Sequence, residues 1–360
     1  MPSSTPIVGA VRGRGAKSNH SGRFESGQRE DFDDGWSEDD GEPARAETTL
    51  TAEKAKVIIT RNDSPDIGFD RSINPYRGCE HGCIYCFARP THAYVGLSPG
   101  LDFETKLYFK PEAAALLEKE LSKPSYRPAR IQLGASTDPY QPSERSLRIT
   151  RGVVEVLARF NHPVGITTKN ALVTRDIDIL APMAALNLIV VAMSVTTLDR
   201  RLARTMEPRA STPERRIDAI RQLAEAGVPV VVGAAPMIPG LNDHEMEAIL
   251  ERAAGAGAWG AYYTALRLPL EIKDLFREWL EAEVPDRAAR VMSLVRQMRG
   301  GKDYDAQWFK RMRGDGPIAE LMSRRFKVAK RRFGLDRTIG PLSIDHFRPP
   351  PKTGDQLELF

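Results

Sequence analysis

The sequence predicts an α/β fold, a partial or full β/α (TIM-like) barrel with disordered N- and C-terminal tails. Short apolar runs rich in β-branched residues alternate with amphipathic helical patterns, which is typical of parallel strands covered by helices. Five or six such units recur at spacings of roughly 25–40 residues, and this spacing fits a barrel. A doubly wound open sheet is the alternative, because local patterns do not distinguish the two architectures.

The expected strands begin with a weak run around residues 72–76, followed by five stronger runs. The stronger runs cover residues 130–136, 164–168, 189–196, 228–235 and 260–266.

Three of the intervening helices have recognisable starts. A proline in the first turn begins a helix over residues 111–121, and a Ser-Thr-Pro sequence begins one over 212–226. Asn242, with a glutamate three residues later, gives a capping-box pattern for a helix over 242–254.

Four parts of the chain are expected. Residues 1–55 are predicted to be a disordered tail, because they are rich in Gly, Ser and charge. The barrel core is expected over 56–275, a basic helical region over 276–340 and a flexible tail over 341–360. Neither a signal peptide nor an apolar run of the roughly 20 residues that span a bilayer is evident. We therefore expect a cytoplasmic protein that does not act on membranes.

All three cysteines of the 360-residue chain lie within eight residues, in the spacing Cys79-x3-Cys83-x2-Cys86. Thiolates this close in sequence can converge on one metal centre. A structural zinc needs a fourth ligand, and His81 could supply it. However, His81 is only two positions from both Cys79 and Cys83, and this short spacing makes a tetrahedral site awkward. A catalytic zinc with three cysteines and a water is a further alternative. A 4Fe–4S cluster on three cysteines would leave one iron open for chemistry.

The cysteine spacing, with the aromatic Tyr85 before the last cysteine, resembles the signature of the radical S-adenosylmethionine (radical SAM) superfamily. The strings NPYRGCEHGCIYCFAR (74–89) and TDPYQPSE (137–144) resemble its spore photoproduct lyase-like branch, and the likeness covers roughly residues 60–270. The resemblance implies a 4Fe–4S cluster that binds S-adenosylmethionine (AdoMet) and an electron donor such as flavodoxin or ferredoxin. One electron then cleaves AdoMet, and the 5′-deoxyadenosyl radical abstracts a hydrogen atom.

The resemblance also implies that residues near the carboxyl ends of the strands contact AdoMet. A lysine would face its carboxylate, hydroxyl groups its amino and ribose groups, and an apolar side chain its adenine. An arginine could bind an anionic group of the cofactor or the substrate. For each residue, a purely structural role is the alternative. The candidates are Ser136, Thr137, Asp138, Lys169, Ser194, Arg209 and Ile238.

Two tyrosines are candidate catalytic residues. In spore photoproduct lyase a further cysteine returns a hydrogen atom to the product radical, whereas this chain has no cysteine beyond the three. Tyr262 and Tyr263 are adjacent on the last expected strand, where alternation points one of them inward. An inward tyrosine could relay a hydrogen atom, and an ordinary buried tyrosine is the alternative.

A basic segment favours a nucleic-acid partner. Residues 285–337 carry 15 Lys/Arg and 6 Asp/Glu, a balance of +9 (15 − 6). Within them, Phe326 and Phe333 alternate with cations, a pattern that could contact phosphates and stack on bases. The same segment could instead pack its Phe and Val face onto the barrel.

The last five residues resemble the pentapeptide by which bacterial DNA polymerases and repair proteins bind the sliding clamp. A flexible tether would present their apolar side chains to a groove. The clamp contacts would be Gln356, Leu357, Leu359 and Phe360, and Glu358 departs mildly from the usual pattern.

The sequence therefore favours a radical SAM enzyme, lyase-like and with nucleic acid as a candidate substrate in repair or modification. Two alternatives stay open. One is a non-enzymatic, metal-stabilised nucleic-acid adaptor bound to the clamp. The other is a radical SAM enzyme that acts on a peptide or a small molecule.

Overall fold

The computed structural model describes residues 13–25, 27, 46–337 and 340–350. Its main sheet has seven strands in the order β10-β9-β8-β7-β6-β3-β2. All of them are parallel except β2, which pairs antiparallel with β3 at the edge. The strands are β2 (Ile59–Arg61), β3 (Arg71–Ile73), β6 (Ile131–Leu133), β7 (Val164–Thr168), β8 (Ile189–Ser194), β9 (Val230–Met237) and β10 (Gly260–Ala265).

The strand order decides between the two expected architectures. From β3 to β10 each parallel strand lies beside the next one in the chain, so the order never reverses as it does in a doubly wound sheet. The two edge strands, β2 and β10, are not paired with each other. The fold is therefore a partial barrel.

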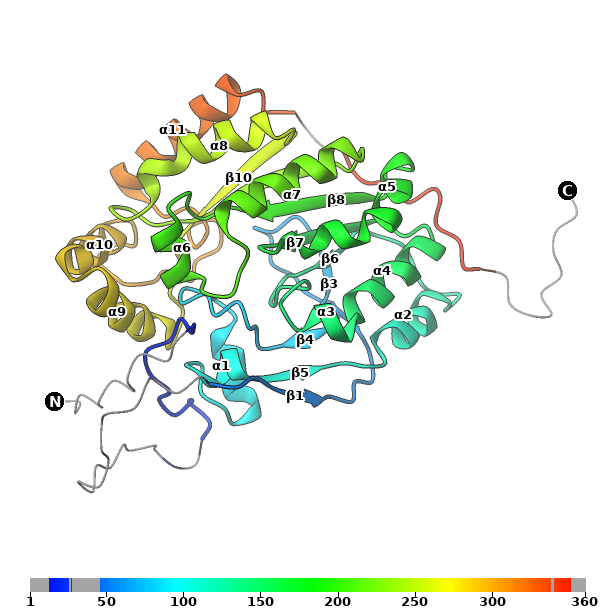
Figure 1. Ribbon diagram of the computed structural model, residues 1–360, viewed down its shortest axis with the longest axis horizontal. Coiled ribbons are helices and arrows are strands. Elements are labelled where there is room, and N and C mark those ends of the chain that lie inside the picture. Colours follow the sequence, from blue (N-terminus) through cyan, green and yellow to red (C-terminus); the bar gives the residue numbers. More distant parts are fainter. Residues whose placement is uncertain (1–12, 26, 28–45, 338–339, 351–360) are drawn as a thin grey trace, which may run out of the picture.

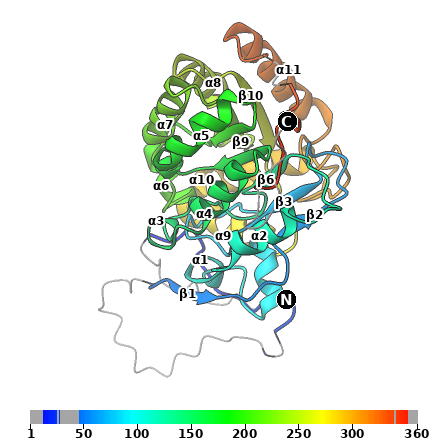
Figure 2. The same ribbon diagram turned by 90° about the vertical axis from the view of Figure 1, so that its right-hand side faces the viewer.

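Helices cover the outer face of this sheet (Figures 1 and 2). Fully buried side chains such as Ile166, Val191 and Val232 point from the strands into this helical layer and form the main core. The layer consists of α2 (Ala113–Leu121), α3 (Glu144–Leu147), α4 (Ile149–Arg159), α5 (Ile177–Ala185), α6 (Arg200–Met206), α7 (Pro213–Glu225), α8 (Met246–Gly255) and α11 (Gly316–Arg332).

A second, smaller sheet lies beside the first (Figure 1). It has the order β1-β5-β4, formed by β1 (Thr49–Ala52), β5 (Lys106–Phe109) and β4 (Tyr76–Arg77). The short helix α1 (Asp102–Thr105) precedes β5 directly, and α9 (Ile272–Glu283) and α10 (Pro285–Gln297) form a second apolar core with the cysteine loop.

The capping patterns in the sequence predict the start of α7 correctly but not the cap of α8. Thr212 caps α7 by accepting a hydrogen bond from the amide of Arg215, as its Ser-Thr-Pro sequence predicts. The capping box at Asn242 is wrong. Its side chain instead accepts from the amide of Ile238 and donates to the carbonyl of Thr196, so α8 begins only at Met246.

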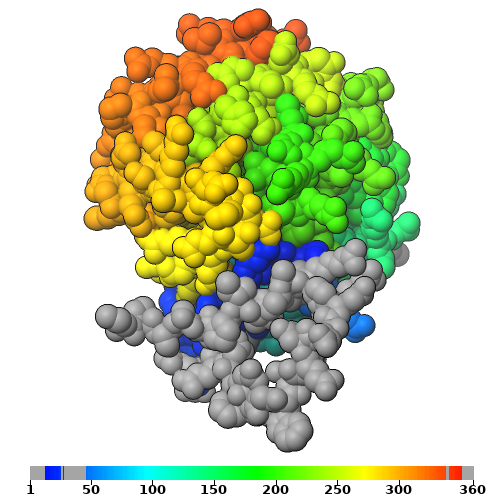
Figure 3. Space-filling model, turned by 60° about the vertical axis from the view of Figure 1, so that its left-hand side comes forward, coloured from blue at the N-terminus to red at the C-terminus, as the bar shows by residue number. Residues whose placement is uncertain are grey.

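Part of the segment that was expected to be a disordered tail is ordered. Arg14 and Ala16 are buried, and β1 lies within residues 46–55. Figure 3 shows the described N-terminal residues, in blue, against the yellow α9 region. Salt bridges of Lys17 to Glu283 (2.5 Å) and of Arg23 to Glu271 (3.1 Å) join the two.

The basic segment packs onto the barrel through both of its phenylalanines, Phe326 and the half-buried Phe333. Phe326 of α11 is buried, and its ring centroid lies 4.8 Å from that of Tyr263. Base stacking by Phe326 is therefore wrong. The expected Val face is wrong as well, because Val328 is 66% exposed. Among the described residues, no helix is long and apolar enough to cross a membrane.

Candidate active site

The three cysteines lie in a buried loop that follows β4. Cys79 and Cys83 are buried and Cys86 is half-buried, and none of the three is in a disulfide. Cys86 packs against both apolar groups that contain the other two cysteines. Burial raises the pKa of each thiol. The thiols are therefore neutral until a metal binds, and metal binding would release their protons.

A buried ion pair between Arg89 and Glu104 supports the cysteine loop. Arg89 donates to the carbonyl oxygens of Gly82 (3.1 Å) and Cys83 (2.9 Å), and it pairs with Glu104 at 2.5 Å. The side chains of Arg89 and Glu104 are fully buried. A buried pair of this kind needs its remaining polar atoms satisfied, and here backbone groups of the loop do so. Sequence reasoning did not single out the role of either residue.

The N-terminal segment completes this support. The amides of Gly15 and Ala16 donate to the two carboxylate oxygens of Glu104, at 2.9 and 2.8 Å. Gly15 lies so close to the cysteine loop that a Cβ there would be 1.9 Å from the carbonyl oxygen of Gly82. Glycine is therefore the residue that this contact allows.

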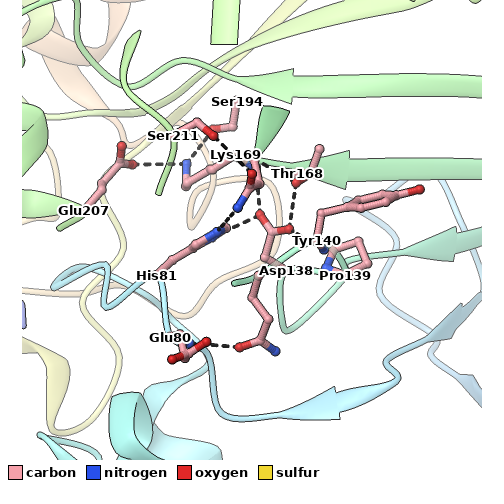
Figure 4. Close-up of polar contacts among 12 residues, drawn as sticks. Glu80, His81, Asp138, Pro139, Tyr140, Thr168, Lys169, Ser194, Glu207 and Ser211 are labelled. Atoms are coloured by element: carbon pink, nitrogen blue, oxygen red, sulfur yellow. Dashed lines mark hydrogen bonds and ion pairs between the residues drawn. The ribbon is translucent and has the colours of Figure 1, made fainter. Parts of the chain in front are cut away.

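Asp138 organises the polar side of the loop (Figure 4). It accepts hydrogen bonds from Thr168 Oγ1 (2.7 Å) and the amide of Lys169 (2.7 Å), and it lies 3.3 Å from Nδ1 of His81. Burial acts to raise the pKa of Asp138, but His81 and these donors outweigh it and hold the pKa below its ordinary value. Asp138 thus ties the ends of β6 and β7 to the cysteine loop.

Lys169 extends across the carboxyl ends of the next two strands. Its ammonium nitrogen lies 2.5 Å from Ser194 Oγ and 3.1 Å from the carbonyl oxygen of Ala235. It also lies 5.6 Å from the ring centroid of Tyr85. Burial lowers the pKa of Lys169 to about 8, and Cys83 acts in the opposite direction. The expected pair of Lys169 and Ser194 is therefore brought together beside the cysteines.

Glu207 is a buried partner in this site that sequence reasoning missed. It accepts hydrogen bonds from Tyr85 and from Thr196 (2.7 Å), and it pairs with Arg216 at 2.5 Å. Lys169 lies 3.4 Å from the same carboxylate. Burial raises the pKa of Glu207, and Arg216 opposes this. The carboxylate offsets the two cations and fixes the tyrosine that lies between two of the cysteines.

The other expected cofactor residues make mainly structural contacts. The amide of Ser136 donates to Asn74 Oδ1, and Thr137 Oγ1 donates to the carbonyl of Tyr76. Ile238 is fully buried in the apolar group that contains Cys83. Arg209 pairs with Glu80 at 3.2 Å, so its guanidinium braces the cysteine loop.

The two tyrosines of β10 point in opposite directions. Tyr263 packs against α11 through Phe326, outside the barrel, so the prediction that it is catalytic is wrong. Tyr262 lies on the inner face, where a Cβ on Gly233 would be 2.6 Å from its hydroxyl. Gly233 pairs with Ser194 on its other side, so one strand, β9, separates Tyr262 from the Lys169–Ser194 pair.

The donor set fits an iron–sulfur cluster better than zinc. In the described part of the chain, no three His, Cys, Asp or Glu side chains are close enough together to hold one metal ion. His81 does not supply a fourth ligand, because its two ring nitrogens lie 3.3 Å from Asp138 and 3.2 Å from Asn170. Three buried thiols with no fourth protein donor match a cluster with one open iron.

Comparison with known proteins agrees with this site. Residues 73–253 match the radical SAM superfamily. An uncharacterized protein of Mycobacterium tuberculosis is 37% identical over 231 residues, which cover 64% of this chain and 68% of that protein. An uncharacterized protein of Methanocaldococcus jannaschii is 28% identical over 197 residues, or 53% of this chain and 69% of that one.

Among solved structures, the fold is similar to that of spore photoproduct lyase. One variant of that enzyme, with bound AdoMet and dinucleoside spore photoproduct, has a TM-score of 0.51 at 14% identity, over 79% of this chain and 78% of the other. The chain belongs to the radical SAM superfamily. It is accordingly an enzyme of a class that uses a 4Fe–4S cluster and AdoMet.

Proposed function

We propose that this enzyme uses Cys79, Cys83 and Cys86 to hold its cluster and removes a hydrogen atom from a nucleic-acid substrate. The observation that carries the proposal is the position of the Lys169–Ser194 pair beside the three cysteine thiols, which have no fourth protein donor among the described residues. When bound, the cluster and AdoMet supply the reductive cleavage by which the superfamily breaks C–H bonds.

The residues around the cysteines prepare the site for these groups. Lys169 presents a cation to the AdoMet carboxylate, and Ser194 is a hydrogen-bond partner for its amino group. Asp138, together with Ser136 and Thr137, fixes the loop that follows β6. Ile238 supplies an apolar wall for the adenine. Thr137, Ser194 and Ile238 are buried, and a site that excludes water protects a reactive radical from side reactions.

Tyr262 is the remaining catalytic candidate. It lies inside the barrel, and burial raises the pKa of its hydroxyl to about 12. The hydroxyl therefore keeps its hydrogen at neutral pH. We propose that Tyr262 gives its hydroxyl hydrogen atom to the product radical, in place of the cysteine that the chain lacks. The tyrosyl radical that remains would then regain one electron from the reductant and one proton from solvent. With Tyr262→Phe we expect AdoMet cleavage to continue while substrate turnover stops, and unchanged turnover would refute this role.

Nucleic acid as the substrate class rests on charge and on fold. Lys327 and Arg331 of α11 are exposed, and neither makes an ion pair with a described residue. By contrast, Arg325 is bound by Glu247 at 2.7 Å. Free cations on one helix suit a phosphate backbone. The fold is similar to that of an enzyme solved with a dinucleoside photoproduct.

Binding of oligonucleotides at several salt concentrations tests the substrate class. We expect affinity for DNA or RNA to fall steeply with salt, because phosphate contacts release counterions. The double variant Lys327→Glu/Arg331→Glu should weaken binding, whereas Lys123→Glu, an exposed change after α2, should not. If the affinity for nucleic acid is the same at all salt concentrations and in the α11 variant, a peptide or small-molecule substrate is favoured.

Three predictions are not tested by the described residues: binding to the sliding clamp, the identity of the reductant and the location in the cell. The clamp-binding peptide, residues 356–360, lies outside the described part of the chain. Its removal should abolish capture by the sliding clamp, and unchanged capture would contradict it. A reductant of the flavodoxin or ferredoxin kind and a cytoplasmic location also stay predictions.

A further inference from the structure

Arg130 is a half-buried cation, with a buried Nε, that the site described above does not use. It lies just before β6, and its side chain crosses the backbone of β7: a Cβ on Gly165 would be 2.3 Å from Nη2 and 2.6 Å from Nε. The guanidinium therefore lies flat against the inner face of the barrel. A side chain at position 165 would displace it.

This guanidinium lacks the partners that fully buried arginines have. Its Nη2 donates to Oε1 of Gln132 at 2.9 Å, but its Nε is buried without a hydrogen-bond acceptor in the described structure. Burial lowers the pKa of Arg130, and no carboxylate opposes this, only the hydroxyl of Tyr262. In contrast, Arg89 and Arg216 each pair with a buried carboxylate at 2.5 Å. An unpaired buried charge costs free energy unless a ligand compensates it.

A chain of polar side chains leads from Arg130 towards the candidate active site. Gln132 Nε2 donates to Thr167 Oγ1 at 3.0 Å, and Thr167 in turn hydrogen-bonds to Tyr262. Tyr262 lies across Gly233 from Ser194. Along β7 and one residue beyond it, the four residue steps from Gly165 to Lys169 span about 13 Å.

The inner face of the barrel is open to solvent, so a ligand can reach this chain. Thr167, Ala192 and Tyr262 are half-buried, whereas Ile166 and Val191, which point outward from the same strands, are fully buried beneath helices. The glycines at positions 165 and 233 make space on this face for the side chains of Arg130 and Tyr262, which lie directly against them.

We propose that Arg130 binds a phosphate group of the substrate inside the barrel, so that the rest of the substrate extends along β7 towards Tyr262 and Ser194. A guanidinium binds phosphate through two parallel hydrogen bonds, and the two Nη atoms of Arg130 can supply them, since its Nε is buried. The choice of phosphate over carboxylate rests on the proposed nucleic-acid substrate. Arg130 thereby selects substrates that carry a phosphate at a fixed distance from the reacting carbon.

Thermal unfolding and binding measurements on three proteins test this proposal: the wild type, Arg130→Gln and the control Arg127→Gln. Arg127 is an exposed arginine three residues away. The probes are inorganic phosphate, a thymidine dinucleotide with one bridging phosphate, and acetate at matched ionic strength. Because all three proteins experience the same general salt effect, differences between them report the site.

We expect phosphate and the dinucleotide to raise the Tm of the wild type and of Arg127→Gln but not of Arg130→Gln. Dinucleotide affinity should fall about 30-fold in Arg130→Gln. Without a ligand, Arg130→Gln should unfold at a Tm no lower than the wild type, because an unpaired, half-buried charge has been removed. Arg130→Lys, which keeps the charge but not the paired hydrogen bonds, should bind with intermediate affinity.

Other outcomes would overturn the proposal. A lower ligand-free Tm in Arg130→Gln would make the arginine a structural residue. If phosphate still raises the Tm of Arg130→Gln, or does not raise the Tm of the wild type, Arg130 does not form an anion-binding site. Protection by acetate alone would indicate a carboxylate-bearing substrate. These readouts need no AdoMet cleavage, so they stay separate from a failure of the proposed function.

Discussion

At the residue scale, Lys169 is the side chain on which AdoMet binding most depends. It follows β7 directly and reaches the carboxyl ends of β8 and β9 through Ser194 and the carbonyl of Ala235, and it lies beside Glu207. Its burial has a cost, which the lowered pKa of about 8 reflects. A cation held in a dry site at such a cost is typical of a binding group.

Replacement of Lys169 by methionine should weaken AdoMet binding and leave the cluster in place. Loss of one charge-assisted contact costs about 2 kcal/mol, or about 30-fold in affinity. Equilibrium binding of AdoMet to the reconstituted variant measures this loss, with iron content as the check on the cluster. Lys123→Met, an exposed lysine, is the matched control. Equal affinities for the two variants would rule out contact between Lys169 and AdoMet.

Residue-scale prediction from the sequence succeeded where one short segment carries the chemistry. The three cysteines are adjacent in the chain, and their spacing indicated a cluster. Glu104, Glu207 and Arg130 were missed because each acts on residues far away in the chain: Glu104, for example, binds Gly15, 89 residues before it. Tyr262 and Tyr263 could be narrowed to one candidate only when the strand direction was known.

At the element scale, the strands were predicted well and one helix start was not. Strands such as β8, with its run of branched apolar residues, are buried on their outer face and therefore carry a strong local pattern. The capping box at Asn242 was wrong because a tertiary contact competed for its side chain, although a 3-10 turn (Asp243–Glu245) does begin directly after it. Asn242 binds the carbonyl of Thr196, 46 residues away, and so does not cap α8.

The N-terminal segment was also mispredicted at this scale, because its glycine-rich composition resembles that of a disordered tail. Its residues 13–25 instead gain order from specific contacts: the amides of Gly15 and Ala16 on Glu104, and salt bridges to α9. Composition does not report such contacts. The segment holds the cysteine loop against the second core, so it should matter for cluster retention.

Gly15→Ala should therefore destabilise the protein and loosen the cluster. The added methyl group would overlap the carbonyl of Gly82, and such overpacking costs about 2 kcal/mol. Thermal unfolding and the rate of iron loss to a chelator measure the two effects. Gly68→Ala is the matched control, because a Cβ there meets nothing within 4 Å. If both variants keep iron equally well, the segment does not support the loop.

At the scale of the whole molecule, the partial barrel places every candidate group at one end or on the inner face. The sequential strand order brings the ends of β6, β7, β8 and β9 together, and the cysteine loop lies across them (Figure 1). The periodicity of the sequence predicted this arrangement of strand ends. It could not show that the barrel is open, because the edge strands β2 and β10 carry no local signal of pairing.

Acid should destabilise the whole molecule through His162. Burial lowers the pKa of His162 to about 4, and its Nε2 lies 2.8 Å from the hydroxyl of Tyr126. The unfolded chain binds a proton near pH 6.5 and the folded chain only near pH 4, so stability is complete above pH 6.5 and falls between these values. The loss is about 3 kcal/mol between pH 7 and pH 4.

Urea unfolding of the wild type and of His162→Gln at pH 7 and pH 4 measures this contribution. We expect the variant to be less stable at pH 7 but to lose about 3 kcal/mol less on acidification. Equal losses in the two proteins would show that His162 is not the residue responsible.

The most direct test of the central claim is to measure iron, acid-labile sulfide and 5′-deoxyadenosine formation on anaerobically reconstituted wild type and Cys79→Ala. The account predicts about four iron and four sulfide per wild-type chain, and AdoMet cleavage on reduction. Cys79→Ala should lose both the cluster and the cleavage. A wild-type protein that holds a single zinc, or a Cys79→Ala variant that still cleaves AdoMet, would contradict the assignment of these cysteines to the cluster.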